Sequence, residues 1–419
     1  MPKASRPPLA ALLGPGLITG AADDDPSGIA TYAQAGAEFG PHAIWSLLLA
    51  LPFMAGIQEI SARIARVTGR GLADNMLHRY PRWLALGLIL LMAVANICNL
   101  GADLGAMAAA LALLIGGPVK LYVIGFAVVS TALQIFLRYD DYAGILKWLT
   151  LSLLAYVGSA CVAGVPWGSV ALAVVWPHIE WSGRYAVIIV AVLGTTISPY
   201  LFFWQAGLEV ERQRQEVGMK PLRRAPEQAR AEIMRIRWDT LTGMVLSTLI
   251  ALCIAVTTYG GLNLHGVTEI RSASQAAETL RPIAGNFAFL LFAAGIIGTG
   301  LLAVPSLAGS AAYALGAAAG LRTGLAFRFG RAKGFYAILA AVTAIGCGLD
   351  FIGIDPMDAL VWSAVLNGVA AAPIMATLVR MAGDRRVMGL FVISRGLALN
   401  GWGGTAMMAA AAVAMLLMQ

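Results

Sequence analysis

Long apolar stretches separated by short polar segments run through almost the whole chain. A helix needs about 20 apolar residues to cross a bilayer, and about eleven stretches approach or exceed that length. We predict them at residues 10–35, 42–66, 83–115, 119–137, 143–164, 185–210, 239–260, 285–317, 335–351, 357–379 and 399–418. The pattern predicts an all-α integral membrane protein with one transmembrane domain over residues 1–419.

The first of these stretches begins and ends as an apolar helix, but its middle is polar. Asp23, Asp24 and Asp25 stand at its centre and are followed by Pro26 and Gly28. A central Asp costs about 2.5–3.5 kcal/mol on insertion scales, and proline removes a backbone hydrogen-bond donor. Broken helices at membrane depth are tolerated only where protein or a polar cavity surrounds them. We therefore interpret this break as half of an ion-binding site.

The sixth stretch is broken as well, at Pro199. Both breaks are followed by the tripeptide Gln-Ala-Gly, at residues 34–36 and 205–207. One interrupted segment in each half of the chain is typical of a transporter whose site lies between inverted repeats. We therefore expect the two breaks to face each other.

Composition agrees with a membrane protein and gives its expected orientation. The chain is 59% hydrophobic and only 12% charged, about half the charge of a soluble domain. If the N-terminus is cytoplasmic, 25 of the 29 Lys and Arg residues fall on the cytoplasmic side. The positive-inside rule then predicts a plasma (inner) membrane protein with its C-terminus outside. The net charge of +7 reflects this topology, so we expect the bilayer as a partner and no nucleic acid.

Motifs for other chemistries are missing from the sequence. The four cysteines lie far apart in apolar stretches and fit neither zinc spacing nor a disulfide framework. No phosphate-binding loop and no Gly-x-Ser-x-Gly elbow is present. We expect no enzyme activity, no cofactor and no required protein partner.

Asp25 is the main candidate metal ligand. It directly precedes the first break, where unwound carbonyls, including that of Ala22, would add hard oxygen ligands for a divalent ion. The alternative is that Asp25 only caps the helix that starts at Pro26, and both roles are compatible. Asp23 and Asp24 cannot face the same point as Asp25, and we expect one of the three acids to face an outer or inner vestibule and concentrate cations there.

The second break and the third stretch supply further candidates. Ser198 offers a hydroxyl and Thr195 a freed carbonyl, although Ser198 would instead satisfy the backbone loosened by proline. Tyr200 either packs or lines the cavity. In the third stretch, Asn99 and Asp103 are four residues apart and share a helix face.

The longest polar segment lies on the predicted cytoplasmic side. We expect its residues 227–238 to form a short amphipathic helix at the membrane surface, either touching anionic lipid or serving as a solvated connector.

Several short motifs carry a family resemblance. Gly14-Pro15, Asp25-Pro-Ser-Gly28, Gln34-Ala-Gly-Ala37 and Phe39-Gly40 resemble the first helix of the Nramp divalent-metal transporters. Residues 194–200 resemble their broken sixth helix. The resemblance implies a LeuT-type fold of two inverted five-helix repeats, about residues 10–164 and 185–379, plus an extra helix at 399–418.

The departures from the family motifs bear on the ion. The family has Asp-Pro-Gly-Asn in the first helix, so Gly28 occupies the position of an Asn ligand. It has Met-Pro-His in the sixth, where this chain has Ser198, Pro199 and Tyr200. Loss of the thioether and of the histidine associated with proton movement favours a harder ion. The pattern is closest to the Nramp-related magnesium transporters.

From these motifs we expect import of a hard divalent cation, Mg²⁺ or Mn²⁺, by alternating access, with weak or absent proton coupling. Asp24, Asn99, Asp103 and Tyr200 are candidates for proton movement or the vestibule. The alternatives are a proton-coupled Nramp-type symporter of Mn²⁺ or Fe²⁺, a LeuT-type carrier of small organic solutes, and a membrane sensor without transport.

Overall fold

The computed structural model of the protein describes residues 14–136, 153–162, 164–270, 273–281, 285–353 and 355–418. These residues form helices and loops, and none of them lies in a β-strand. In chain order the helices are α1 (Pro15–Asp23), α2 (Pro26–Phe39), α3 (Pro41–Thr68), α4 (Leu72–Arg79), α5 (Arg82–Ile115), α6 (Val119–Phe136), α8 (Leu154–Val162), α9 (Trp167–Val175), α10 (Gly183–Thr196), α11 (Pro199–Gln215), η3 (Pro226–Gln228), α12 (Ala229–Gly261), η4 (Asn263–His265), α13 (Ala273–Glu278), η5 (Gly285–Phe287), α15 (Ala288–Ala318), η6 (Phe329–Arg331), α16 (Lys333–Leu349), α17 (Pro356–Ala382), α18 (Arg385–Met388) and α19 (Arg395–Met418).

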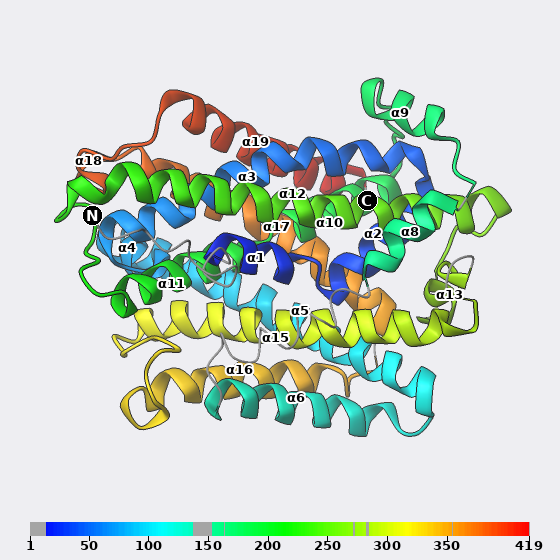
Figure 1. Ribbon diagram of the computed structural model, residues 1–419, viewed down its shortest axis with the longest axis horizontal. Helices are drawn as coiled ribbons and strands as arrows, with labels where there is room; N and C mark the ends of the chain where they lie inside the picture. The colour runs from blue at the N-terminus through cyan, green and yellow to red at the C-terminus, as the bar shows by residue number, and fades with distance from the viewer. Residues whose placement is uncertain are drawn as a thin grey trace, which may run out of the picture.

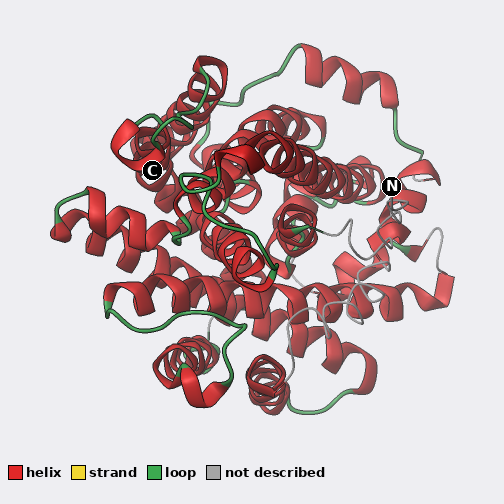
Figure 2. Ribbon diagram, turned by 60° about the vertical axis from the view of Figure 1, so that its left-hand side comes forward, coloured by secondary structure: helices red, strands yellow, loops and turns green. Residues whose placement is uncertain are grey.

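Most of the long helices run roughly along the long axis of the molecule (Figure 1), and a turned view shows several of them nearly end-on (Figure 2). Eight helices of the described residues are long and apolar enough to cross a membrane, counting α10 and α11 as one. The predicted all-α integral membrane class is therefore confirmed. The count of eleven stays a prediction, because much of the expected span 143–164 lies outside the described residues.

Both predicted helix breaks are present. The first apolar stretch is divided where α1 ends at Asp23 and α2 begins at Pro26. The sixth is divided where α10 ends at Thr196 and α11 begins at Pro199. In each case proline occupies the first position of the second half, where its missing N–H leaves no bond unmade and its fixed φ suits a helix start.

Helix α1 lies against α12 along a seam of glycines. A Cβ on Gly16 would lie 2.6 Å from the backbone nitrogen of Thr240, and one on Gly20 would lie 2.5 Å from the backbone of Gly243. Small residues allow such close backbone contact between membrane helices. The seam fixes the register of α1 on α12, and with it the direction in which the residues of the break point.

The expected separate surface helix at residues 227–238 is wrong. A short 3₁₀ turn, η3, is followed by α12, which continues without interruption through the membrane segment. No proline or glycine interrupts the chain between Ala229 and Thr242. The charged residues Glu232, Arg235 and Asp239 lie three and four positions apart, so they share one face and pair there.

The charged face of α12 binds the first turn of α1. Asp239 accepts hydrogen bonds from the backbone nitrogens of Gly16 at 2.8 Å and Leu17 at 3.1 Å. Arg235 lies 3.5 Å from Asp239 and binds Glu209 of α11 at 2.6 Å. The first turn of α1 is thus capped by a carboxylate from another helix, which is in turn tied to the second broken helix.

Candidate metal centre

The first break is organised by Asp25. Its backbone is extended, with φ −69° and ψ 168°, and its Oδ1 accepts a hydrogen bond from the Gly28 nitrogen at 2.6 Å. This is the capping role that the sequence left open, because the carboxylate satisfies an N–H that has no partner within the helix. The side chain is only 1% exposed. Capping uses one of its two oxygens and leaves the second for other partners.

The second oxygen of Asp25 contacts side chains from two other helices, and one of these side chains also reaches α1. Oδ2 accepts a hydrogen bond from Asn99 Nδ2 of α5 at 3.0 Å and lies 3.2 Å from the Tyr200 hydroxyl of α11. That hydroxyl also lies 2.9 Å from the carbonyl oxygen of Ala22 in α1. Because a hydroxyl has one proton, it donates to only one of these two acceptors at a time. Ala22, Asp25, Asn99 and Tyr200 therefore form one buried oxygen-rich cluster.

At the second break, the side chain of Ser198 provides most of the hydrogen bonds to the backbone carbonyls that the break leaves without partners. The Ser198 hydroxyl lies 2.6 Å from the Gly194 carbonyl and 2.9 Å from the Thr195 carbonyl. This is the backbone-satisfying role that the sequence offered as the alternative for Ser198. The Thr195 carbonyl keeps a second lone pair, since each carbonyl oxygen accepts two bonds.

Gly28 brings the two breaks into contact. A Cβ at this position would lie 3.2 Å from the Thr195 hydroxyl oxygen, 3.3 Å from the Asp23 carbonyl and 3.3 Å from Asp25 Oδ1. Three oxygens from both broken segments thus surround the place where a larger residue would project. The structure places the Thr195 side chain there, whereas the sequence pointed only to its carbonyl.

Asp103 lies one helical turn after Asn99 on α5 and contacts the first break through Ser27. Its Oδ1 accepts a hydrogen bond from the Ser27 nitrogen at 3.2 Å, and its Oδ2 has no hydrogen-bond partner. The hydroxyl of Ser363 of α17, which sequence reasoning missed, lies 2.9 Å from Asn99 Oδ1 and 2.8 Å from the Leu360 carbonyl of its own helix. It was hard to find because a single serine in an apolar helix most often bonds its own backbone.

Asp23 and Asp24 point away from this cluster. Both side chains are buried, at 0% and 5% exposure, and both lie within hydrogen-bonding reach of the Ser247 hydroxyl on α12. Their partner thus differs from the partners of Asp25, which are Gly28, Asn99 and Tyr200. Neither acid lines a solvent-filled vestibule in this structure.

The buried acids have no basic partner. None of the ion pairs formed by the described residues includes Asp23, Asp24, Asp25 or Asp103. Ionised carboxylates buried without a counter-charge are strongly disfavoured. No group of three or more His, Cys, Asp or Glu side chains in the described residues is arranged to hold a metal. A cation here would bind one carboxylate and neutral oxygens.

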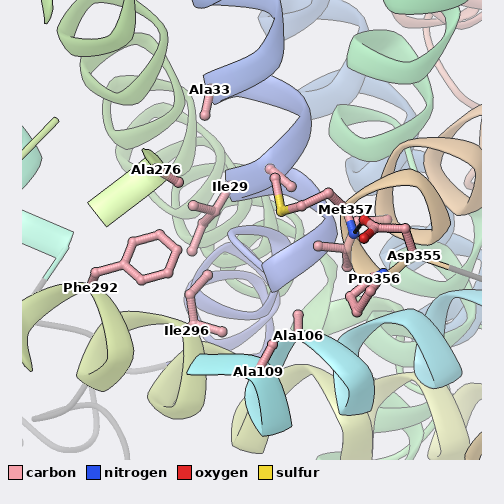
Figure 3. A pocket seen from close by; sticks show the side chains of 12 residues that line it. Ile29, Ala33, Ala106, Ala109, Ala276, Phe292, Ile296, Asp355, Pro356 and Met357 are labelled. Atoms are coloured by element: carbon pink, nitrogen blue, oxygen red, sulfur yellow. Dashed lines mark hydrogen bonds between the residues drawn. The ribbon is translucent and has the colours of Figure 1, made fainter. Parts of the chain in front are cut away.

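A cavity of about 190 Å³ lies beside the first turns of α2 (Figure 3). Its walls come from α2, α5, α13, α15 and the start of α17, and they are mostly apolar: Ile29, Ala30, Ala33, Ala106, Ala109, Ala276, Phe292, Ile296, Pro356, Met357 and Leu360, with Asp355. Asp355 Oδ1 caps α17 by accepting a bond from the Met357 nitrogen at 2.8 Å. Asp25, Asn99 and Tyr200 are not among the lining residues, so the cavity ends short of the oxygen-rich cluster.

Comparison with known families identifies the chain's relatives. The family model described as natural resistance-associated macrophage protein-like, Nramp, matches residues 16–418. The chain belongs to the Nramp family. The divalent metal cation transporter MntH of Deinococcus radiodurans is 28% identical over 408 residues, covering 93% of this chain and 86% of that protein. MntH of Verminephrobacter eiseniae is 26% identical over 395 residues, covering 90% of this chain and 82% of that protein.

Solved structures show the same fold. A point mutant of the manganese transporter of Eremococcus coleocola superposes with a TM-score of 0.77 at 15% identity, covering 97% of this chain and 86% of that one. Mhp1, a nucleobase-cation-symport-1 transporter, superposes with a TM-score of 0.56 at 15% identity, covering 100% of this chain and 94% of that one. The Nramp chain therefore has the LeuT-type fold, and the resemblance read from its motifs is confirmed.

Proposed function

We propose that this Nramp-family divalent metal transporter imports a hard cation, Mg²⁺ or Mn²⁺, by alternating access and with weak or absent proton coupling. The observation that carries the proposal is the cluster around Asp25. One carboxylate, the Ala22 carbonyl, the Asn99 amide and the Tyr200 hydroxyl meet where two broken helices face each other. Broken helices placed in this way are the usual substrate sites of transporters with inverted repeats.

The chemistry of the cluster favours a hard ion. None of the groups that hydrogen-bond to Asp25 or to the Ala22 carbonyl carries sulfur or imidazole. Carboxylate, carbonyl and hydroxyl oxygens suit Mg²⁺ and Mn²⁺, whereas thioethers select softer metals. The Asn99 amide presents its nitrogen to Asp25 and so orients the carboxylate. Mg²⁺ also keeps several of its waters when bound, which suits a site with a single carboxylate.

Weak coupling follows from the residue at position 200. The family motif has a histidine there, which changes its charge near neutral pH, and this chain has Tyr200. A tyrosine hydroxyl, unlike an imidazole, does not change its charge near neutral pH, and the Tyr200 hydroxyl donates its one proton to either the Ala22 carbonyl or the Asp25 carboxylate. Tyr200 would hold the ligands in place and carry no proton across the membrane.

Asp103 supports the second candidate, a proton-coupled symporter of Mn²⁺ or Fe²⁺. Its Oδ2 is buried and has no hydrogen-bond partner, and its Oδ1 binds Ser27, two residues after Asp25. A carboxyl group so close to the metal ligand would release a proton when the cation arrives. In that case Asp103→Asn would abolish acidification while leaving some metal uptake.

The proposal is tested by uptake of Mg²⁺ and Mn²⁺ into proteoliposomes that contain the wild-type protein, Asp25→Ala or Glu227→Gln. Glu227 is an exposed carboxylate in η3 at the predicted cytoplasmic surface and serves as the matched control. We expect uptake to be lost in Asp25→Ala and kept in Glu227→Gln. Unchanged uptake in Asp25→Ala would contradict the proposed site.

A further inference from the structure

The Asn99 amide ends in a nitrogen that donates and an oxygen that accepts, and only one of them can face Asp25 at a time. In this structure the nitrogen faces Asp25. Nδ2 lies 3.0 Å from Asp25 Oδ2, while Oδ1 lies 2.9 Å from the Ser363 hydroxyl of α17. Asn99 and Ser363 are 1% and 3% exposed. Buried protein groups therefore hold the amide at both ends.

A cation at Asp25 changes which end of this amide is useful. The nitrogen carries hydrogens toward the site and is no ligand for a hard cation, whereas the side-chain oxygen of an asparagine is one. Rotation of the amide about its Cβ–Cγ bond exchanges the two ends and brings the oxygen beside Asp25. A buried side chain can rotate in this way only if its nitrogen then finds an acceptor, because an unpaired buried donor is costly.

Ser363 can provide that acceptor. A hydroxyl has one proton and two lone pairs, so it can donate in one direction and accept from another. Ser363 Oγ lies 2.8 Å from the Leu360 carbonyl as well as 2.9 Å from Asn99 Oδ1. When it donates to Asn99 it satisfies the amide oxygen, and when it donates to Leu360 it can accept from the amide nitrogen. The same hydroxyl therefore suits both orientations of the amide.

Ser27 supports the exchange from the first break. Its hydroxyl lies 3.1 Å from the Leu360 carbonyl and 3.4 Å from Ser363 Oγ. The Leu360 carbonyl thus keeps a hydroxyl partner whichever way Ser363 points. Because Ser27 follows Pro26 at the start of α2, this chain of hydrogen bonds begins and ends at the first break.

We propose that Asn99 is a ligand of the transported cation and that Ser363 is a positioning residue that lets the Asn99 amide rotate. In the empty site the amide nitrogen binds Asp25. In the loaded site the amide oxygen binds the cation and the nitrogen binds Ser363. The inference rests on the proposed transport site at Asp25, and it adds to that site a hard oxygen ligand from α5.

Binding of Mn²⁺ to the purified full-length protein in nanodiscs tests the role of Asn99. If the nitrogen stayed on Asp25, it would compete with the cation for Oδ2, and Asn99→Leu would leave the Kd equal or lower. If the oxygen is a ligand, the Kd for Mn²⁺ should rise roughly tenfold in Asn99→Leu. An unchanged or lower Kd overturns the proposal.

Asn96→Leu is the matched control, because it makes the same substitution on the same helix, one turn earlier. The Asn96 nitrogen lies 3.1 Å from the Leu307 carbonyl and 2.7 Å from the Ser310 hydroxyl, both on α15. We expect the Kd for Mn²⁺ to stay at the wild-type value in this variant. Circular dichroism and size-exclusion profiles establish that each variant is folded. An equal rise of the Kd in both variants would assign the effect to the packing of α5 and overturn the proposal.

Electron–nuclear double resonance of bound Mn²⁺ reports the ligand directly. The protein is labelled with ¹³C at the side-chain carbonyl of asparagine. We expect a hyperfine coupling between Mn²⁺ and ¹³C in the wild-type protein and in Asn96→Leu, and no such coupling in Asn99→Leu. A wild-type protein that binds Mn²⁺ without this coupling would show that the amide oxygen does not reach the cation.

Substitutions of Ser363 test the positioning role. Without its hydroxyl, the amide leaves its oxygen unpaired in the empty site and its nitrogen unpaired in the loaded site, and an unpaired buried N–H is the less tolerated of the two. Ser363→Ala should therefore raise the Kd for Mn²⁺ roughly fivefold, and Ser363→Thr, which keeps a hydroxyl, should restore it. A wild-type Kd in Ser363→Ala would contradict the role of Ser363.

Asp25→Ala separates this inference from the transport site on which it rests. Loss of Mn²⁺ binding in Asp25→Ala, together with wild-type binding in Asn99→Leu, would refute the role of Asn99 alone. Wild-type binding in Asp25→Ala would refute the proposed site, and this inference with it.

Discussion

The hydroxyl of Tyr200, in the first turn of α11, lies 3.2 Å from the carboxylate of Asp25, at the start of α2. Asp25 directly precedes Pro26, which starts α2, and Tyr200 directly follows Pro199, which starts α11. The contact therefore joins the two breaks directly. The same hydroxyl reaches the Ala22 carbonyl on the other side of the first break. Tyr200 thus positions two candidate ligands with one atom.

Tyr200→Phe removes that atom and keeps the ring. We expect the KM for Mg²⁺ uptake to rise about tenfold, or about 1.4 kcal/mol, because one hydrogen bond to a charged ligand is lost. The maximal rate should change less than the KM. Initial rates of Mg²⁺ entry into proteoliposomes over a range of concentrations measure both, and an unchanged KM would show that Tyr200 does not position the ligands.

Ser198→Met places a thioether where the family motif has one. We expect the ratio of Mn²⁺ to Mg²⁺ uptake to rise roughly fivefold, because sulfur favours the softer ion. Some loss of total activity should accompany it, since Ser198 no longer satisfies the Gly194 carbonyl. Ser198→Ala is the matched control for that loss alone. A ratio that is the same in both variants would show that position 198 does not face the ion.

The positions of the breaks were predictable from sequence, and so was the place of Asp25 at the first of them. Proline and three consecutive acids are both expensive in a membrane, so their presence in an apolar stretch indicates a break that surrounds a polar site. The directions of Asp23 and Asp24 were not predictable. Successive residues on a helix point about 100° apart, and which neighbour each one meets depends on how α1 packs on α12. That register is set by Gly20 and Gly243, which are far apart in the chain.

Single polar residues in apolar helices were the other part of the site that could not be predicted from the sequence. Ser247 and Ser363 each stand alone in an apolar helix, and nothing in their local sequence distinguishes them from a serine that bonds its own backbone. Their contacts with Asp24 and Asn99 appear only when α12 is placed against the end of α1, and α17 against α5. The prediction of a separate surface helix before α12 was wrong for a related reason. The charged residues of this segment pair with each other along one continuous helix, which is α12 itself.

Asp239→Asn weakens the cap on α1. The variant keeps one acceptor oxygen, but it loses the charge that holds two backbone N–H groups and Arg235. We expect the free energy needed to separate the start of α1 from α12 to fall by about 1–2 kcal/mol, so this opening should become roughly tenfold more frequent. Alkylation of Thr19→Cys, buried in α1, in a background with the four native cysteines replaced by serine measures this opening. Equal alkylation rates with and without the Asp239→Asn substitution would contradict a capping role.

Asp384 gives the protein a stability that depends on pH. The backbone N–H of Arg386 and the guanidinium of Arg79 hold the pKa of this carboxyl below its ordinary value of 3.8. A lowered pKa in the folded state stabilises the protein above the unfolded pKa, and this contribution is lost as pH falls through the folded value. Asp384→Asn should therefore lower the Tm by roughly 1–2 °C at pH 7, since a partly exposed ion pair contributes little.

The effect of Asp384→Asn should shrink as the pH falls below about 3.8, because the unfolded wild-type chain then binds a proton that the folded carboxyl, with its lowered pKa, takes up only at lower pH. Thermal unfolding of both proteins at pH 7, 5 and 3.5 measures it. A difference in Tm that stays constant over this range would mean that the amide disturbs the α18 cap and not the charge.

The most direct test of the proposed transport is divalent-ion flux into proteoliposomes that contain an internal pH dye, with Mg²⁺ and Mn²⁺ compared in the same preparation. The cluster of Asp25, Ala22, Asn99 and Tyr200 predicts entry of Mg²⁺ without acidification of the interior. Entry of Mn²⁺ but not of Mg²⁺, accompanied by acidification that disappears in Asp103→Asn, would contradict it and show a proton-coupled symporter.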